Sequence, residues 1–278
     1  MKRFTTSDGV DIAYETSGNG RPLVLLHGLM AHRGFFEAQR PLESDFRLIS
    51  IDLRDHGASR AEALRPTIAR MAADVAELVE HLDLRDAIGV GWSLGASVLW
   101  QVLAGPASHR FAGTVIVDMT ARVLNGPDWQ LGLSREHCDA RSAAIRDDYQ
   151  SFAMAAGQNI FAQPIAAEKS DLALWAGEQF ALNDPATMGA VWESLAASDE
   201  RPLLPTIEQP TLIVHGLKSQ LYGSETAQHL ASALPHARII PFERSGHAPH
   251  MEQPELFNAI IRDFAASLPP VHHTEPTA

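Results

Sequence analysis

The chain has 278 residues, of which 45% are hydrophobic and 20% are charged, and its formal net charge is -12. These proportions exclude a disordered chain, and the length suits one large domain with an inserted segment. The negative charge argues against nucleic acid and against an anionic membrane surface as partners, because both would repel the protein.

Cysteine use and the N-terminus both bear on the compartment. Cys138 is the only cysteine, so no disulfide can form within the chain. Residues 1–9 contain no apolar run of the kind that a signal peptide needs. Together these features predict a cytoplasmic protein.

The first predicted element is a hairpin. Residues 4–16 alternate between apolar and polar around Asp8-Gly9, a dipeptide that favours a tight turn between antiparallel strands. Runs rich in Val, Ile and Leu then predict strands buried on both faces. These runs are residues 23–26, 48–51, 87–90 and 115–117, and strands are predicted again at residues 211–214 and 238–242.

Helices are predicted between these strands. Residues 67–84 carry apolar side chains at intervals of three and four positions, with acidic side chains on the other side. Residues 96–103, 224–234 and 255–267 predict further helices. Strands that alternate with helices predict an α/β fold with a doubly wound, mostly parallel sheet.

Residues 120–205 interrupt this alternation. They contain several helix-like stretches and no convincing strand, so they predict a helical lid inserted into a core of residues 1–119 and 206–270. The lid contains Trp129, Trp175 and Trp192, which are candidate substrate contacts; packing of the lid onto the core is the alternative role for them. Residues 271–278 are predicted to be a disordered tail.

The motif that carries chemistry lies at residues 91–95, which read G-x-S-x-G between the predicted strand at 87–90 and the predicted helix at 96–103. A sharp turn from strand to helix would expose the hydroxyl of Ser93 at the carboxyl end of the sheet. It would also aim the backbone N–H of Leu94 at a developing oxyanion. Ser93 is therefore the predicted nucleophile, and the neighbouring Trp92 is a candidate substrate contact.

Two further loops end at the same edge of the predicted sheet. The turn after residues 23–26 offers the N–H of Leu29 as a second oxyanion donor, while His27 is expected to be structural. His247 follows the last predicted strand and precedes the final helix, which makes it the predicted general base. His250 is the alternative base.

These motifs together resemble the α/β-hydrolase superfamily. The resemblance rests on residues 27–28, 52–59, 91–95 and 245–249, in that order, and it covers nearly all of the predicted core. It implies an eight-stranded, mostly parallel sheet, a Ser-acid-His triad, no cofactor, and a lid that shapes the substrate pocket. One departure is Asp55, which stands where a glycine is usual.

A second departure concerns the triad acid. Members of the family usually carry it in a Gly-x-x-Asp pattern after the strand at residues 211–214, but this chain has Gly216 followed by Ser219. Asp118 is the predicted replacement, because it ends the preceding strand and some family members carry the acid there. The alternatives are that Asp118 only caps the turn into the lid, or that Glu225 or another carboxylate completes the triad.

The motifs predict a serine hydrolase that cleaves a small-molecule carboxylic ester, lactone or thioester through an acyl-enzyme on Ser93. The aromatic lid favours a largely apolar substrate. A cofactor-free haloperoxidase or perhydrolase and a carbon-carbon bond hydrolase share the same triad and remain alternatives. Because Ser219 replaces the usual acid, a non-catalytic ligand-binding protein on the same fold is the alternative from another class.

Overall fold

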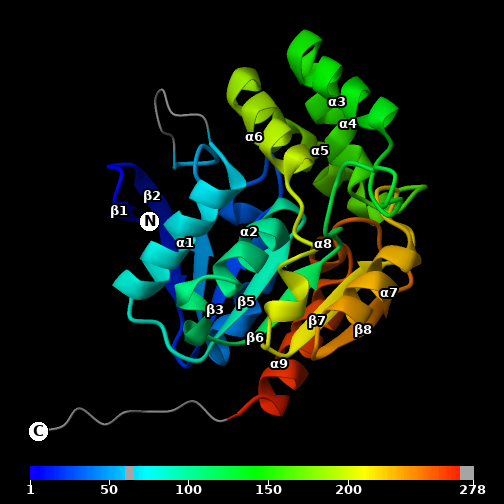
Figure 1. Cartoon of the computed structure of the whole chain (residues 1–278). Helices are drawn as coiled ribbons and strands as arrows, with labels where there is room; N and C mark the ends of the chain where they lie inside the picture. Colours follow the sequence, from blue (N-terminus) through cyan, green and yellow to red (C-terminus); the bar gives the residue numbers. More distant parts are fainter. Residues whose placement is uncertain (60–65, 270–278) are drawn as a thin grey trace, which may run out of the picture.

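One sheet runs through the molecule, and its strands follow the order β1-β2-β4-β3-β5-β6-β7-β8. The computed structural model describes residues 1–59 and 66–269 (Figure 1). The predicted tail at residues 271–278 lies outside the described residues. The strands are β1 (Lys2–Thr5), β2 (Asp11–Ser17), β3 (Arg21–Leu26), β4 (Phe46–Ile51), β5 (Ala87–Trp92), β6 (Phe111–Val117), β7 (Thr211–Gly216) and β8 (Ala237–Phe242).

The pairing of the strands confirms the predicted architecture. β1 and β2 form the antiparallel hairpin, and β2 also pairs antiparallel with β4. All other neighbouring strands pair in parallel. Parallel neighbours need crossover connections, and helices supply them on both faces of the sheet.

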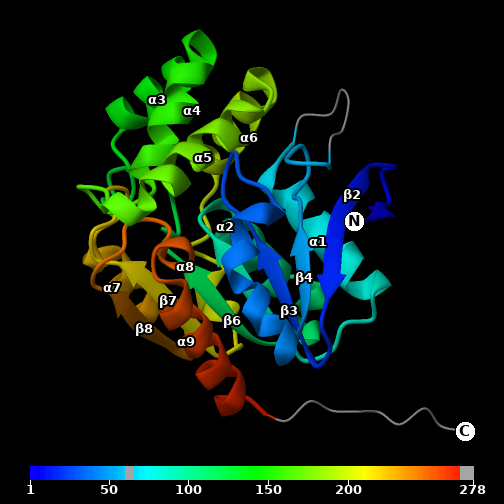
Figure 2. The ribbon, with the colours of Figure 1, turned by 180° about the vertical axis from the view of Figure 1, so that it is seen from behind.

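Helices on both faces explain why the central strands are buried along their whole length. Every residue of β3, β5 and β7 is buried. Figure 1 shows α1 and α2 over one face, and Figure 2 shows α9 over the other. The helices outside the segment between β6 and β7 are called the core helices. They are η1 (Arg33–Ser44), α1 (Ile68–His81), α2 (Leu94–Leu103), η2 (Pro106–Arg110), η4 (Leu204–Thr206), α7 (Ser224–Ala233), α8 (Pro249–Glu252) and α9 (Pro254–Ser267).

The predicted helix at residues 67–84 shows how local sequence sets the ends of α1. The hydroxyl of Thr67 accepts a hydrogen bond from the N–H of Arg70 at 3.1 Å, which caps the first turn. The helix ends at His81, three residues before the predicted end, and Asp83 then adopts a φ of 44°. Such a left-handed residue stops the helix and turns the chain toward β5.

Asp55 ends a tight turn after β4. Its φ is 63°, and its N–H donates to the carbonyl of Ser59 at 2.7 Å. Asp is among the few residues besides glycine that tolerate a positive φ, which accounts for an aspartate where the family resemblance implies glycine. The carboxylate of Asp52 accepts hydrogen bonds from the N–H groups of Arg33 and Ala58, both at 2.8 Å, and holds the turn in place.

Helices fill the segment between β6 and β7, as predicted. Both views show α3 to α6 as a separate layer beyond the strand ends (Figures 1 and 2). Nowhere in residues 1–59 and 66–269 does a helix have the length and apolar character needed to cross a membrane. The helices of this segment are α3 (Arg135–Asp147), α4 (Tyr149–Asn159), η3 (Ala167–Lys169), α5 (Ser170–Ala181) and α6 (Pro185–Ala197).

A pair of helical glycines provides a test of the packing. A Cβ at Gly95 in α2 would lie 2.2 Å from the carbonyl oxygen of Leu26, whereas a Cβ at Gly189 in α6 would lie 3.7 Å from its nearest neighbour. Gly95→Ala should therefore lower the free energy of unfolding by about 1–3 kcal/mol. Gly189→Ala should raise it by about 0.5–1 kcal/mol, because alanine favours the helix.

Urea unfolding followed by circular dichroism measures both changes in the same background. Equal stability of Gly95→Ala and the unsubstituted protein would contradict the close approach of α2 to β3.

Candidate active site

Ser93 lies in the sharp turn between β5 and α2. Its φ of 53° and ψ of -120° fall in a region that residues with a side chain rarely adopt. The serine precedes α2 but makes no side-chain capping hydrogen bond to it. The turn therefore presents the hydroxyl while leaving it free of the usual local partner.

The glycines of the G-x-S-x-G motif allow this turn to pack. A Cβ at Gly91 would lie 2.6 Å from the carbonyl oxygen of Gly95, and Gly95 itself presses against β3. Neither contact has room for a side chain. The motif thus brings the end of β5, the start of α2 and the end of β3 together.

Two backbone amides next to Ser93 have no acceptor among residues 1–59 and 66–269. They are the N–H groups of Leu94, the first residue of α2, and of Leu29, after β3. The β3 turn lies close to the serine, since a Cβ at Gly28 would be 3.3 Å from the Cβ of Ser93. The two predicted oxyanion donors are therefore in the neighbourhood of the hydroxyl and unused within the described structure.

His27 has a structural environment, as expected. Its Nε2 accepts the N–H of Leu53 at 3.0 Å, and its Nδ1 lies 2.8 Å from the carbonyl oxygen of Gly28. Burial lowers the pKa of His27 well below its ordinary value. A neutral imidazole here donates through Nδ1 and links the β3 turn to the end of β4.

His247 and Asp118 meet in the interior. His247 Nδ1 lies 2.7 Å from Asp118 Oδ2, although the residues are 129 positions apart. Asp118 directly follows β6 and has a φ of 45°, which bends the chain as it leaves the sheet. The turn into the helical segment has hydrogen bonds that do not involve Asp118, because the Thr120 hydroxyl lies within bonding distance of the carbonyls of Arg122 and Leu131.

Asp118 has two further side-chain donors, which no pattern in the sequence indicates. The hydroxyl of Ser219 donates to Asp118 Oδ2 at 2.6 Å, and His215 Nδ1 lies 2.9 Å from Asp118 Oδ1. Burial alone would raise the pKa of Asp118, but the hydrogen bonds from His215, His247 and Ser219 lower it below the ordinary value. The serine at the usual acid position thus contacts the acid that replaces it.

Contacts on both sides fix the loop that carries His247. The indole N–H of Trp92 donates to the His247 carbonyl at 2.8 Å. The carboxylate of Glu252 accepts the N–H of Gly246 at 2.7 Å and that of Ala162 at 2.8 Å. Glu252 therefore connects the histidine loop to the helical segment between β6 and β7.

His250 is the alternative base and Glu225 is the alternative acid. His250 is fully buried beside Trp92, both its ring nitrogens lack a partner within the described structure, and burial lowers its pKa to about 3. Glu225 is exposed in the first turn of α7. Among residues 1–59 and 66–269, no group of three or more His, Cys, Asp or Glu side chains is arranged to hold a metal ion.

A cavity of about 220 Å³ lies over Ser93 and His247. Its walls come from the core turns and from α3, α4 and α5 of the helical segment. Most of its side chains are apolar, and one, Arg141, is a cation. The lining residues are Gly28, Leu29, Met30, Trp92, Ser93, Arg141, Phe152, Ala155, Ala156, Asn159, Ile160, Phe180, Gln220, Leu221 and His247.

The three tryptophans of the helical segment do not line this cavity, in contrast to the expected substrate contacts. Trp129 donates its indole N–H to the carbonyl of Arg122 at 2.8 Å, and Trp192 donates to the hydroxyl of Ser142 at 3.0 Å. Trp175 packs against the core, with its ring 4.7 Å from that of Phe35. Residue type alone could not distinguish these packing tryptophans from Phe152 and Phe180, which do line the cavity.

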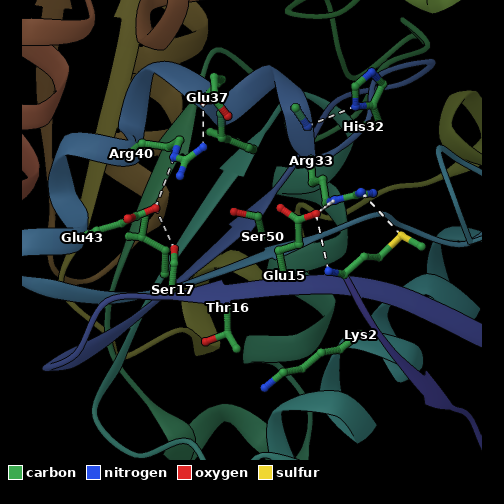
Figure 3. Close-up of a pocket in the computed structure, with 14 residues that line it drawn as sticks. Lys2, Glu15, Thr16, Ser17, His32, Arg33, Glu37, Arg40, Glu43 and Ser50 are labelled. Atoms are coloured by element: carbon green, nitrogen blue, oxygen red, sulfur yellow. Dashed lines mark hydrogen bonds and ion pairs between the residues drawn. The ribbon is translucent and has the colours of Figure 1, made fainter.

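A second hollow, of about 550 Å³, lies beside β2 and η1 (Figure 3). Most of its charged groups pair with one another: Arg40 lies between Glu37 and Glu43, at 3.3 and 3.4 Å, and Arg33 contacts Glu15 at 3.1 Å. Ser93 and His247 are not among its lining residues. The smaller cavity is therefore the candidate active site.

Comparisons with known proteins agree with this geometry. Residues 23–260 match the model of the alpha/beta hydrolase family. The chain is 32% identical over 251 residues to a pimeloyl-[acyl-carrier protein] methyl ester esterase from Nitrosomonas europaea, a match that spans 88% of this chain and 96% of that protein. It is 26% identical over 270 residues to the AB hydrolase superfamily protein YisY from Bacillus subtilis, spanning 94% and 98% of the two chains.

A solved structure is similar over almost its whole length. The esterase from Exiguobacterium antarcticum superposes with a TM-score of 0.90 at 26% identity, covering 95% of this chain and 99% of that one. The strand order, the turn at Ser93 and the family match all indicate the same family. The chain belongs to the alpha/beta hydrolase family, and its relatives include esterases.

Proposed function

We propose that this protein hydrolyses a carboxylic ester through an acyl-enzyme on Ser93, with His247 as general base and Asp118 as the triad acid. The observation that carries the proposal is the joint placement of Ser93 and His247 on one cavity, with His247 hydrogen-bonded to a buried carboxylate. Esterases among the relatives support the same class of reaction.

In the first half-reaction, Ser93 Oγ attacks the ester carbonyl while His247 Nε2 takes the hydroxyl proton. The N–H groups of Leu29 and Leu94 stabilise the oxyanion that forms on the carbonyl oxygen. The tetrahedral intermediate then breaks its bond to the alcohol, and the imidazolium returns the proton to the leaving oxygen. The acyl group remains on Ser93.

In the second half-reaction, a water molecule donates a proton to His247 and attacks the acyl carbon. The acid is released when the bond to Ser93 Oγ breaks and the serine regains its proton. No step in this sequence requires a cofactor. Residues 120–205 act as the lid in this proposal, because Arg141, Phe152 and Phe180 from that segment line the cavity.

Asp118 is proposed as the acid because its Oδ2 accepts the Nδ1–H of His247, which leaves Nε2 of the neutral ring ready to accept a proton. The lowered pKa keeps this carboxylate ionised when the imidazolium forms. Ser219 and His215 orient the carboxylate from its other side. These contacts favour a catalytic protein over a non-catalytic one, because a carboxylate other than residue 219 contacts His247.

The nucleophile and base are tested by Ser93→Ala and His247→Ala. Each should lower kcat by about 10⁴-fold or more, and the double variant should be scarcely slower, because the two residues act in one step. Turnover of p-nitrophenyl acetate measures the rates, and labelling with a fluorophosphonate reports the nucleophile directly. Losses that multiply in the double variant would show that the residues do not share a mechanism.

The acid is tested by comparing three variants with one ester. Asp118→Asn keeps the shape but favours the wrong tautomer of His247, so kcat should fall by about 10⁴-fold. Ser219→Ala removes one neutral donor and should cost about tenfold or less. Glu225→Gln, at an exposed position, should change nothing. If Asp118→Asn kept more than a tenth of the original kcat, another group would have to be the acid.

A further inference from the structure

The cavity over Ser93 contains one cation, Arg141, which comes from the middle of α3. No other lining residue is a Lys, Arg, Asp or Glu. Its guanidinium carbon lies 4.8 Å from the centre of the Trp192 ring and 5.9 Å from that of Phe152. The guanidinium therefore lies between aromatic rings at the edge of a largely apolar cavity.

Arg141 has neither an ion pair nor a hydrogen bond with any residue in the described part of the chain. The other arginines with little exposure do have such partners. Arg54 pairs with the carboxylates of Asp8 and Asp74, at 2.8 and 2.7 Å. Arg21 donates to two backbone carbonyls near the end of α9. Among the described arginines that are not exposed, Arg141 is thus the one whose guanidinium donors have no partner in the described residues.

The N–H groups of Arg141 remain open to the cavity, because none of them is among the buried nitrogens that lack a partner, so they can bind water or an anion there. Burial lowers the pKa of Arg141, which reflects the loss of water around the charge. The aromatic rings stabilise the cation from its faces but cannot accept the five N–H bonds in its plane. Those donors form a rigid fork that matches the two oxygens of a carboxylate.

We propose that Arg141 binds a carboxylate that the substrate carries in addition to its ester bond. This inference rests on the proposed esterase function and specifies its substrate class. It also changes the expectation of a largely apolar substrate: Phe152, Ile160 and Leu221 receive the apolar part, while one end is anionic. A cavity of about 220 Å³ suits a short compound with both groups.

Arg141 could instead serve only to hold α3 against its neighbours, since Trp192 belongs to α6 and Phe152 to α4. A packing role would affect all substrates alike. A carboxylate site would affect only those that carry the charge. The test therefore compares esters that have the same shape and differ only in charge.

Two series of substrates place the charge on either side of the ester bond. In the acyl series, the monomethyl esters of succinate, glutarate and adipate are each compared with the corresponding primary amide, with acid release followed by pH-stat titration. In the alcohol series, 4-acetoxybenzoate is compared with 4-acetoxybenzamide. The unsubstituted protein should prefer at least one acid over its amide by about tenfold or more in kcat/KM.

Arg141→Met should abolish this preference, because kcat/KM should fall by about tenfold more for the acid than for the amide. The matched control is Arg146→Met, which removes the same charge from an exposed position on the same helix, where Arg146 pairs only with Asp147 among the described residues. This control should keep the preference for the acid. Arg141→Lys should keep part of it, because the charge remains but the fork is lost.

No preference for an acid in either series would overturn the inference while leaving the esterase function standing. An equal loss with acid and amide in Arg141→Met would assign Arg141 to packing and also overturn it. If no ester is turned over at all, calorimetric titration of the Ser93→Ala protein with glutarate and with 4-hydroxybenzoate tests the carboxylate site independently of catalysis. Binding that Arg141→Met abolishes supports the carboxylate site, and absence of binding to either compound overturns it.

Discussion

The candidate site depends on the hydrogen bonds that surround the buried carboxylate of Asp118. A lone ionised carboxylate in the interior is costly, so it persists only where several donors surround it. Here three side chains supply them: His247 after the last strand, His215 at the end of β7, and Ser219 in the turn that follows. The same hydrogen bonds that keep the charge stable also fix the ring that is proposed to act as base. One charge thereby joins the ends of two strands to the loop before α8.

The turn at Ser93 imposes the second constraint. Its unfavourable backbone angles are maintained because the glycines on either side let α2 lie directly against β3 and β5. The same packing brings close to Ser93 two amides that have no acceptor within the described residues. A close-packed sheet edge therefore supports a strained serine beside two unused donors, which is the arrangement that the proposed oxyanion stabilisation needs.

The helical segment contributes in a different way, through the chemical character of the cavity. Its tryptophans pack the helices onto one another and onto the core, while smaller apolar groups and Arg141 reach the cavity. The segment also contacts the histidine loop, because the N–H of Ala162 and that of Gly246 share the carboxylate of Glu252. The segment that lines the cavity and the loop of the proposed base are thus connected through one carboxylate.

The sequence by itself determined the sheet and the helices and located the sharp turn at Ser93, because these depend on local periodicity and on turn residues within a few positions of one another. It also pointed to Asp118 and His247 by their places after strands. The partners of Asp118 and the lining of the cavity were decided by the tertiary structure. His215 lies 97 positions from Asp118, and no local pattern relates them. Likewise, whether an arginine or a tryptophan of the helical segment faces the cavity depends on how its helices dock, and docking is set by contacts between distant parts of the chain.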